Sequence, residues 1–109
     1  MAKVTFIGLD KLLEMMENKE QFKLVEVLGE EEYAKGHLPG SISIPVDQLE
    51  TKAPKMLKKT DTVVVYCANY HCPASTTAAR TLTKMGYKNV LDFKGSKWLW
   101  QWAGLGMMK

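Results

Sequence analysis

Short hydrophobic runs alternate along the chain with stretches in which hydrophobic residues recur at the spacing of an amphipathic helix. The runs predict strands at 4–7, 23–28, 41–44, 62–66 and 89–93. The stretches between and after them predict helices at 9–18, 30–35, 46–57, 74–85 and 95–103. Because strands and helices alternate in this way, the pattern indicates an α/β domain with a largely parallel sheet.

Glycine and proline predict where this pattern is interrupted. The segment Gly36–Gly40 contains two glycines and Pro39, so we expect a tight connection there. The stretch 46–57 contains Pro54, which has no N–H and disfavours a helical residue before it. We therefore expect one or two short helices in this stretch, interrupted near Pro54.

Length and charge narrow the class of protein. The 109 residues fit one domain, which we place at 1–109. Apolar runs are far shorter than the roughly 20 residues that span a bilayer, and the start lacks the apolar segment of a secretory signal. We therefore expect a cytoplasmic protein with no membrane partner. The net charge of +3 is mild and scattered, with Arg80 as the only arginine, so we expect no nucleic-acid partner.

Cys67 is the strongest candidate for chemistry. It follows the hydrophobic run 62–66 directly and opens a short polar loop before the predicted helix 74–85. A buried strand would fix the sulfur, the loop can turn its N–H groups inward, and the helix adds the positive end of its dipole. These features favour a thiolate, which is the nucleophilic form of cysteine. The arrangement predicts covalent chemistry on the Cys67 sulfur.

Three groups of residues resemble a known family. The first consists of Leu-Val-Glu-Val at 24–27 with Glu-Glu-Tyr-Ala-Lys-Gly-His-Leu-Pro-Gly-Ser-Ile-Ser-Ile-Pro at 31–45. The second is Val-Val-Val-Tyr-Cys at 63–67, followed by Ala-Ala at 78–79 and a leucine at 82. The third is Lys-Gly-Ser at 94–96, a tryptophan at 100 and Ala-Gly-Leu at 103–105. On these motifs the chain resembles the single-domain rhodanese-like (sulfurtransferase) family over nearly its whole length.

This resemblance implies a rhodanese-like α/β fold, a five-stranded parallel sheet flanked by helices on both faces. It implies a sulfurtransferase in which Cys67 takes sulfane sulfur from a thiosulfate- or polysulfide-type donor as a persulfide. The acceptor would be cyanide, a thiol or a protein. No metal or other cofactor is implied. By position, the substrate-binding loop would be Ala68, Asn69, Tyr70, His71, Cys72, Pro73 and Ala74.

The chain departs from the family pattern at two places. Glu26-Val27-Leu28 stands where the family usually has Asp-Val-Arg, so an internal charge pair common in the family is expected to be missing. The active loop usually reads Cys-x-x-Gly-Asn-Arg-Ser, whereas this loop is longer and lacks both the glycine and the arginine. Since an arginine would attract an anionic donor, we expect weak affinity for thiosulfate.

A persulfide needs hydrogen bonds to its outer, negative sulfur, and loop amides can supply them. Pro73 has no N–H to give. We expect the amide donors to be Asn69, Tyr70, His71, Cys72 and Ala74, helped by the hydroxyls of Ser75 and Thr76.

The loop also carries a second cysteine and a histidine. Cys72 can resolve the persulfide of Cys67, releasing sulfide and leaving a disulfide, or it can take the sulfur over. It can equally be a small buried side chain at the start of the helix. His71 can lower the pKa of Cys67 or protonate a leaving group, although a loop histidine beside solvent is more often incidental.

A structural role is the preferred interpretation for His37 and Glu26. His37 is expected to tie its turn to neighbouring backbone, and Glu26 to be paired within the fold. Trp98 and Trp102 share one helix face and Trp100 points elsewhere. One or two of the tryptophans are expected to complete the core, leaving another exposed to a partner protein.

Three rival functions are weighed against sulfur transfer. A cysteine-dependent phosphatase needs an arginine after five intervening residues, where this chain has Pro73. A zinc site from Cys67, His71, Cys72 and His37 has suitable ligand types but an unusual spacing. The remaining alternative is a non-catalytic binding module of the same fold, whose cysteine senses oxidants or sulfur without turnover.

Overall fold

The computed structural model describes residues 3–109, so the first two residues of the predicted domain lie outside the described part. Its strands form one five-stranded sheet in the order β1-β5-β4-β2-β3. All neighbouring strands pair in parallel, which confirms the predicted sheet. The strands are β1 (Thr5–Ile7), β2 (Lys23–Glu26), β3 (Ser41–Ser43), β4 (Thr62–Tyr66) and β5 (Asn89–Phe93).

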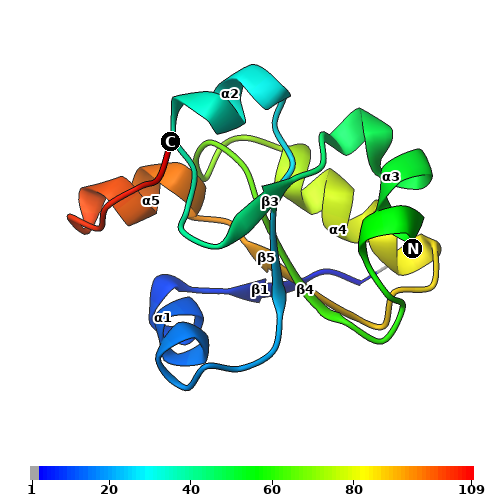
Figure 1. Cartoon of the computed structure of the whole chain (residues 1–109). Helices are drawn as coiled ribbons and strands as arrows, with labels where there is room; N and C mark the ends of the chain where they lie inside the picture. Colours follow the sequence, from blue (N-terminus) through cyan, green and yellow to red (C-terminus); the bar gives the residue numbers. More distant parts are fainter. Residues whose placement is uncertain (1–2) are drawn as a thin grey trace.

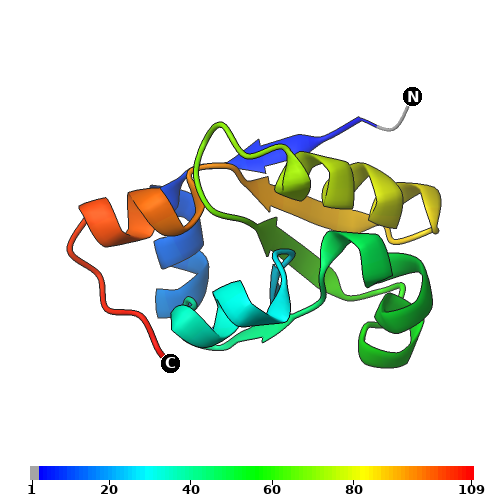
Figure 2. The same cartoon turned by 90° about the horizontal axis from the view of Figure 1, so that it is seen from above.

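Helices cover both faces of this sheet, as expected. They are α1 (Leu9–Glu17), α2 (Glu30–Lys35), the short 3-10 helix η1 (Val46–Gln48), α3 (Leu49–Met56), α4 (Ala74–Lys84) and α5 (Ser96–Trp102). Figure 1 shows α1 and α5 on one side of the strands and α3 and α4 on the other, and the rotated view in Figure 2 agrees. None of the helices in residues 3–109 is both long enough and apolar enough to cross a membrane.

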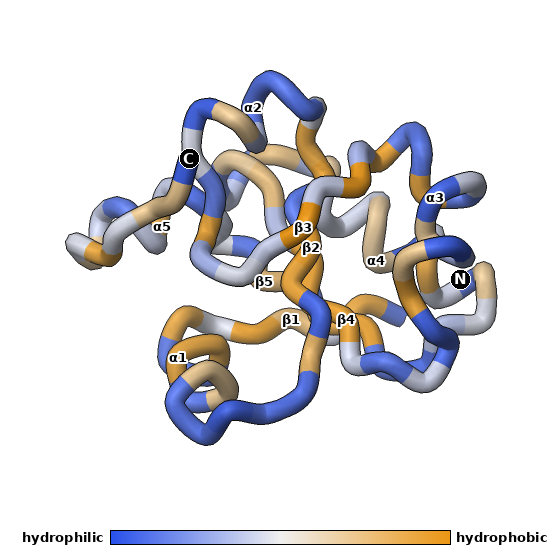
Figure 3. Tube along the Cα trace, viewed as in Figure 1, coloured by the Kyte–Doolittle hydropathy of each residue, from blue (hydrophilic) through white to orange (hydrophobic). Residues whose placement is uncertain are grey.

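Each face of the sheet has its own hydrophobic core. Val63 and Val65 point to the face covered by α3 and α4, where they pack with Leu49 and Leu82. Alternate residues of β4 point to the face covered by α1 and α5, where the buried indole of Trp100 lies. A strand buried on both faces is expected to be continuously apolar, as β4 is. In Figure 3 the central strands are hydrophobic and α2 is mostly hydrophilic.

The prediction of an interruption near Pro54 is wrong. Helix α3 continues through Pro54, and the irregularity falls earlier, where η1 ends at Gln48. Pro54 removes one hydrogen bond of a helix that ends two residues later at Met56. The neighbouring Ala53 is fully buried in the core, and its packing holds the last turn in place.

Strand order brings the ends of β4 and β5 together. The two strands are parallel neighbours in which Val65 pairs with Asp92. Continuing this register places Cys67, just after β4, beside Lys94, just after β5. The carboxyl edge of the sheet, where ligands bind in open α/β folds, therefore carries a thiol and an ammonium side by side.

Candidate active site

Cys67 lies at the carboxyl end of the central strand and is fully buried. Its amide donates a hydrogen bond of 3.0 Å to Ser96 Oγ, which itself donates to the carbonyl oxygen of Phe93 at 3.0 Å. Ser96 Oγ also lies 3.9 Å from the Cys67 sulfur. The sequence interpretation did not identify Ser96 as part of the site. Its backbone is left-handed, with φ of 57°, a conformation that is uncommon for a residue other than glycine.

Helix α5 fixes the start of the loop that follows Cys67. The amide of Lys97 donates to the carbonyl oxygen of Cys67 at 3.3 Å, and that of Trp98 to the carbonyl oxygen of Ala68 at 3.0 Å. These are amides of the first turn of α5, which have no partner within the helix. Figure 2 shows the loop curving past α5 to the start of α4.

Asn69 organises the middle of the loop. Its Oδ1 accepts hydrogen bonds from the amides of His71 at 2.9 Å and Cys72 at 3.1 Å. A side chain that bonds backbone two residues ahead forms a local turn. The prediction that these two amides face the Cys67 sulfur is therefore wrong, because the Asn69 side chain already uses them.

The start of α4 also differs in part from expectation. Thr76 Oγ1 donates to Asp92 Oδ2 at 2.8 Å, so its hydroxyl is turned to β5 and away from the sulfur. Ser75 is fully buried, and its hydroxyl makes no hydrogen bond of ordinary geometry within residues 3–109. Weak interactions of the Ser75 hydroxyl and amide with the Cys67 sulfur nevertheless lower the pKa of Cys67. Of the two hydroxyl residues, Ser75 and not Thr76 therefore interacts with the Cys67 sulfur.

The expectation that the loop favours the thiolate of Cys67 is also wrong. Burial raises the pKa of the Cys67 thiol above its ordinary value and outweighs the hydrogen bonds from Ser75. The carbonyl oxygen of Cys72 lies 3.4 Å from the Cys67 sulfur and accepts its S–H. An acceptor at this position stabilises the protonated form. Cys67 therefore rests as a buried thiol.

Cys72 is where the loop favours negative charge. Burial works against ionisation there, but hydrogen bonding from the Cys67 thiol and from the amides of Ala68 and Ala74 lowers the pKa of Cys72. The charge of Lys94 acts in the same direction. Neither cysteine is in a disulfide. Cys72 is half-buried, whereas Cys67 is inaccessible to solvent.

Lys94 is a site residue that sequence reasoning missed. Its ammonium donates a hydrogen bond of 2.7 Å to the carbonyl oxygen of Cys72. The signal was present in the sequence, since Lys94 follows a hydrophobic run just as Cys67 does. Finding it required knowing that these two strands are neighbours. Lys94 supplies a cation at a loop that lacks the family's arginine.

A buried ion pair lies below the loop. Lys97 Nζ is 3.0 Å from Glu26 Oε1, which also accepts a hydrogen bond of 2.9 Å from the hydroxyl of Tyr66. The pairing of Glu26 within the fold is thereby confirmed. The expected loss of an internal charge pair is wrong, because Lys97 from α5 supplies the cation. Burial raises the pKa of Glu26, and the hydrogen bond and charge of Lys97 oppose this.

The two histidines occupy different places. His71 is exposed, and its ring packs edge-on against Tyr70 with 6.3 Å between centroids, on the outer surface of the loop. His37 stacks on Tyr33 at 3.8 Å, and its Nδ1 lies 3.0 Å from the carbonyl oxygen of Tyr33. The predicted structural role of His37 is confirmed. Residues 3–109 contain no cluster of three or more histidine, cysteine, aspartate or glutamate side chains placed to hold a metal.

The three tryptophans of α5 differ in burial, and Trp98 lies beside the loop. Trp100 is buried and donates through Nε1 to the carbonyl oxygen of Gly106 at 3.0 Å, whereas Trp98 and Trp102 are exposed and stack on each other. This division matches the expectation that one tryptophan completes the core. A hollow of about 330 Å³ lies between the loop and α5, and its lining residues are Asn69, Tyr70, His71 and Trp98.

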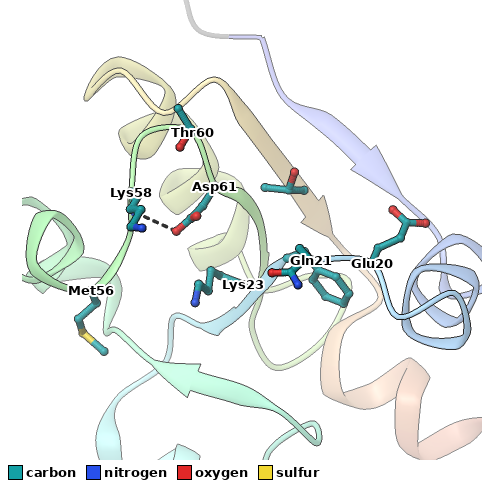
Figure 4. A pocket seen from close by; sticks show the side chains of 9 residues that line it. Glu20, Gln21, Lys23, Met56, Lys58, Thr60 and Asp61 are labelled. Atoms are coloured by element: carbon teal, nitrogen blue, oxygen red, sulfur yellow. Dashed lines mark hydrogen bonds between the residues drawn. The ribbon is translucent and has the colours of Figure 1, made fainter.

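A second hollow, of about 540 Å³, lies at the opposite edge of the sheet. Figure 4 shows it between the start of β2, at Lys23, and the turn before β4, where the amide of Lys58 donates to Asp61 Oδ2 at 2.9 Å. It is far from both cysteines, because they lie at the carboxyl ends of the strands. Apart from Phe22 and Met56 its lining residues are polar or charged, and none is a cysteine or histidine.

Comparison with known families connects this geometry to a named domain. The family model described as the rhodanese-like domain matches residues 8–102, which include both cysteines and Lys94. The chain belongs to the rhodanese-like domain family. Its five-stranded parallel sheet and flanking helices are the rhodanese fold.

Three curated relatives of this rhodanese-like domain are informative. A candidate sulfur carrier protein of Bacillus subtilis is 31% identical over 79% of this chain and 45% of its own length. A candidate mitochondrial thiosulfate sulfurtransferase of Schizosaccharomyces pombe is 37% identical over 73% of this chain and 62% of its own. An HTH-type transcriptional regulator of Mycobacterium tuberculosis is 31% identical over 84% and 41%. The chain thus spans about half the length of these relatives.

Solved structures agree on the fold. A Bacillus halodurans protein superposes with a TM-score of 0.88 at 24% identity, covering 95% of this chain and 76% of its own. The rhodanese-like domain of an Anabaena protein gives 0.85 at 23% identity, covering 98% and 80%. The human single-domain sulfurtransferase gives 0.78 at 23% identity, covering 92% and 96%.

Proposed function

We propose that this rhodanese-like domain is a sulfurtransferase that carries sulfane sulfur as a persulfide on Cys67. The donor is of the thiosulfate or polysulfide type, and the acceptor is a thiol, cyanide or a protein. The observation that carries the proposal is the position of Cys67 at the carboxyl end of β4, where the following loop brings a second thiol and the end of β5 brings Lys94 to the same place. Relatives named for sulfur carriage and thiosulfate sulfur transfer support it.

The first chemical step needs a base, because Cys67 rests as a thiol and the thiolate is the nucleophile. Cys72 is hydrogen-bonded to Cys67 and more readily ionised, so it accepts the proton as Cys67 attacks. The Cys67 sulfur forms a bond to the sulfane sulfur of the donor. The bond from that sulfur to the rest of the donor breaks, and its electron pair leaves with sulfite or a shortened polysulfide.

Lys94 favours anionic donors in this scheme. Its ammonium is the cation that lowers the pKa of Cys72, and one of its N–H groups is already bonded to the Cys72 carbonyl. A single lysine cannot hold an anion through a bidentate fork as an arginine does. Weak affinity for thiosulfate therefore stays our prediction.

We place the activity in the cytoplasm, where thiols are kept reduced.

One observation favours a second function, a sensing module without turnover. Cys67 is fully buried, which slows exchange with a bulky acceptor, and one relative is a transcriptional regulator. In such a module Cys67 would gain one sulfur or be oxidised once, and no further turnover would follow. A catalyst would keep converting cyanide to thiocyanate as long as donor is supplied.

The test is thiocyanate formation from cyanide, with thiosulfate and with a polysulfide as donors, in the wild type and in Cys67→Ser. Continued formation by the wild type and loss in Cys67→Ser support the sulfurtransferase. Sulfur uptake without thiocyanate would support the sensor. Equal rates in the wild type and Cys67→Ser would contradict the proposal.

A further inference from the structure

The two loop cysteines, Cys67 and Cys72, interact with each other. The Cys67 thiol donates a hydrogen bond to the Cys72 carbonyl oxygen at 3.4 Å, and hydrogen bonding from Cys67 also lowers the pKa of the Cys72 thiol. Asn69 holds the backbone of Cys72 in place, because its Oδ1 accepts a hydrogen bond from the Cys72 amide. A sulfur added to the buried Cys67 would have to extend into the same loop, beside Cys72.

The surroundings of Cys67 and Cys72 favour different protonation states of the two thiols. The amides of Ala68 and Ala74 and the ammonium of Lys94 favour a thiolate at Cys72, while burial and a carbonyl acceptor favour a thiol at Cys67. Cys72 is also the more exposed of the two. A side chain that served only to fill space would not need two amides bonded to its sulfur and an ammonium held on its own carbonyl oxygen.

We propose that Cys72 resolves the persulfide of Cys67, so that the two loop cysteines supply the electrons that reduce the sulfane sulfur, which is released as sulfide. This inference rests on the proposed function, because it requires a persulfide on Cys67. It adds a product, a Cys67–Cys72 disulfide, and a partner, a dithiol reductant that restores the pair. A partly exposed Cys72 gives such a reductant a sulfur to attack.

The resolving step forms one sulfur–sulfur bond and breaks another. Cys72 passes the proton it accepted to the outer sulfur of the persulfide and attacks the inner sulfur, that of Cys67. The bond between the two cysteine sulfurs forms, the bond from Cys67 to the outer sulfur breaks, and the electron pair leaves as HS⁻. The sulfane sulfur gains the electrons that the two cysteine sulfurs lose. The dithiol reductant returns these electrons with two protons and becomes a disulfide.

Thiosulfate is the appropriate donor for the test, because its leaving group is sulfite and any sulfide must come from the transferred sulfur. Reduced wild type, Cys72→Ser, Cys72→Ala and Cys67→Ser are each mixed with excess thiosulfate without reductant or cyanide. Released sulfide is measured, and intact mass is recorded before and after thiol alkylation. The excess compensates for weak binding, and circular dichroism checks that each variant is folded.

The wild type should release about one sulfide per chain, lose the mass of two hydrogens and resist alkylation. Both Cys72 variants should instead gain the mass of one sulfur and release less than about a tenth as much sulfide. A wild type that keeps an added sulfur and an alkylatable Cys72 would overturn the resolving role and leave the proposed function intact. The Cys72 variants lack the base of the loading step and should load more slowly, so they are incubated with donor for longer. Absence of added sulfur in them after this prolonged incubation, or its retention in Cys67→Ser, would overturn both.

Discussion

The ammonium of Lys94 donates a 2.7 Å hydrogen bond to the carbonyl oxygen of Cys72, which also accepts the S–H of Cys67. One backbone carbonyl thus connects the ammonium of Lys94 to the thiol of Cys67. The same ammonium lowers the pKa of Cys72 through its charge. The family's arginine is absent from this loop, and a lysine from the neighbouring strand end provides the positive charge.

Replacing Lys94 by Met should make Cys72 harder to ionise, because a nearby positive charge is lost. The Cys67 thiol and the amides of Ala68 and Ala74 still lower the pKa of Cys72, so the pH profile should move only modestly toward alkaline values. The measurement is the rate of iodoacetamide alkylation at Cys72 as a function of pH, read from peptide masses.

Two further variants separate charge from shape at this position. Lys94→Arg keeps the charge and should stay near the wild-type profile. Lys88→Met removes an exposed lysine outside the loop and should leave the profile unchanged. If Lys94→Met also leaves the profile where it was, the ammonium does not tune Cys72.

Replacing Ser75 by Ala should slow the loading of sulfur onto Cys67 by about three- to tenfold, the effect expected from losing one hydrogen bond of ordinary net strength. The Ser75 hydroxyl lowers the pKa of Cys67 and has no other partner of ordinary geometry within residues 3–109. Stability should therefore change little. The loading rate is measured by intact mass with a polysulfide in the Cys72→Ser background.

Thr76→Val is the matched control for Ser75→Ala. It removes a neighbouring hydroxyl that bonds Asp92 and not the sulfur. We expect a loss of about 1 kcal/mol or more in stability, because Asp92 is buried, and an unchanged loading rate. Equal slowing by both substitutions would argue against a specific role of Ser75.

The buried pair of Glu26 and Lys97 makes stability depend on pH. The pKa of Glu26 is raised by folding, so its favourable contribution is complete below the ordinary pKa of glutamate and is lost as pH rises through the folded value. Lys97→Met removes the groups that hold this pKa down. It should cost on the order of 3 kcal/mol at neutral pH and clearly less near pH 5, measured by urea unfolding.

Glu26→Gln combined with Lys97→Met should recover a substantial part of that loss, because no buried charge is then left unpaired. Lys52→Met serves as the comparison. Its partner Glu30 is exposed, so the change should stay within about 0.5 kcal/mol at every pH. A Lys97→Met penalty that is independent of pH would mean that Glu26 is not its charged partner.

The three tryptophans of α5 should differ in their effect on stability. Trp100→Ala should lower the free energy of unfolding by roughly 3 kcal/mol or more, because Trp100 is buried and bonded to the Gly106 carbonyl. Trp102→Ala should cost less than about 1 kcal/mol, since this side chain is exposed and only stacks on Trp98. Similar losses for both would contradict the assignment of faces in α5.

The elements could be predicted from sequence because their signals are local. The hydrophobic run of β4 and the residues of α2 gave the observed bounds, Thr62–Tyr66 and Glu30–Lys35. Pro54 was misleading because proline propensity was weighed without the tertiary packing of Ala53, which keeps α3 helical. Propensity is a weak prior that such packing overrides.

The site could be predicted only in part. The position of Cys67 follows from the pattern of a strand, a loop and a helix. The roles of Lys94 and Lys97 depend on strand order and on the left-handed turn at Ser96, which no local pattern reveals. The balance of charge between Cys67 and Cys72 depends on burial and on where each amide points. These are properties of the folded loop, and the sequence interpretation placed the thiolate on the other cysteine.

The central claim, a persulfide on Cys67, is tested most directly by locating the sulfur. Cys72→Ser is treated with a polysulfide, alkylated and cleaved, and the peptide containing the loop is fragmented. We predict one added sulfur on Cys67 that cyanide removes as thiocyanate. A loop peptide without added sulfur, from a folded protein exposed to excess donor, would contradict the account.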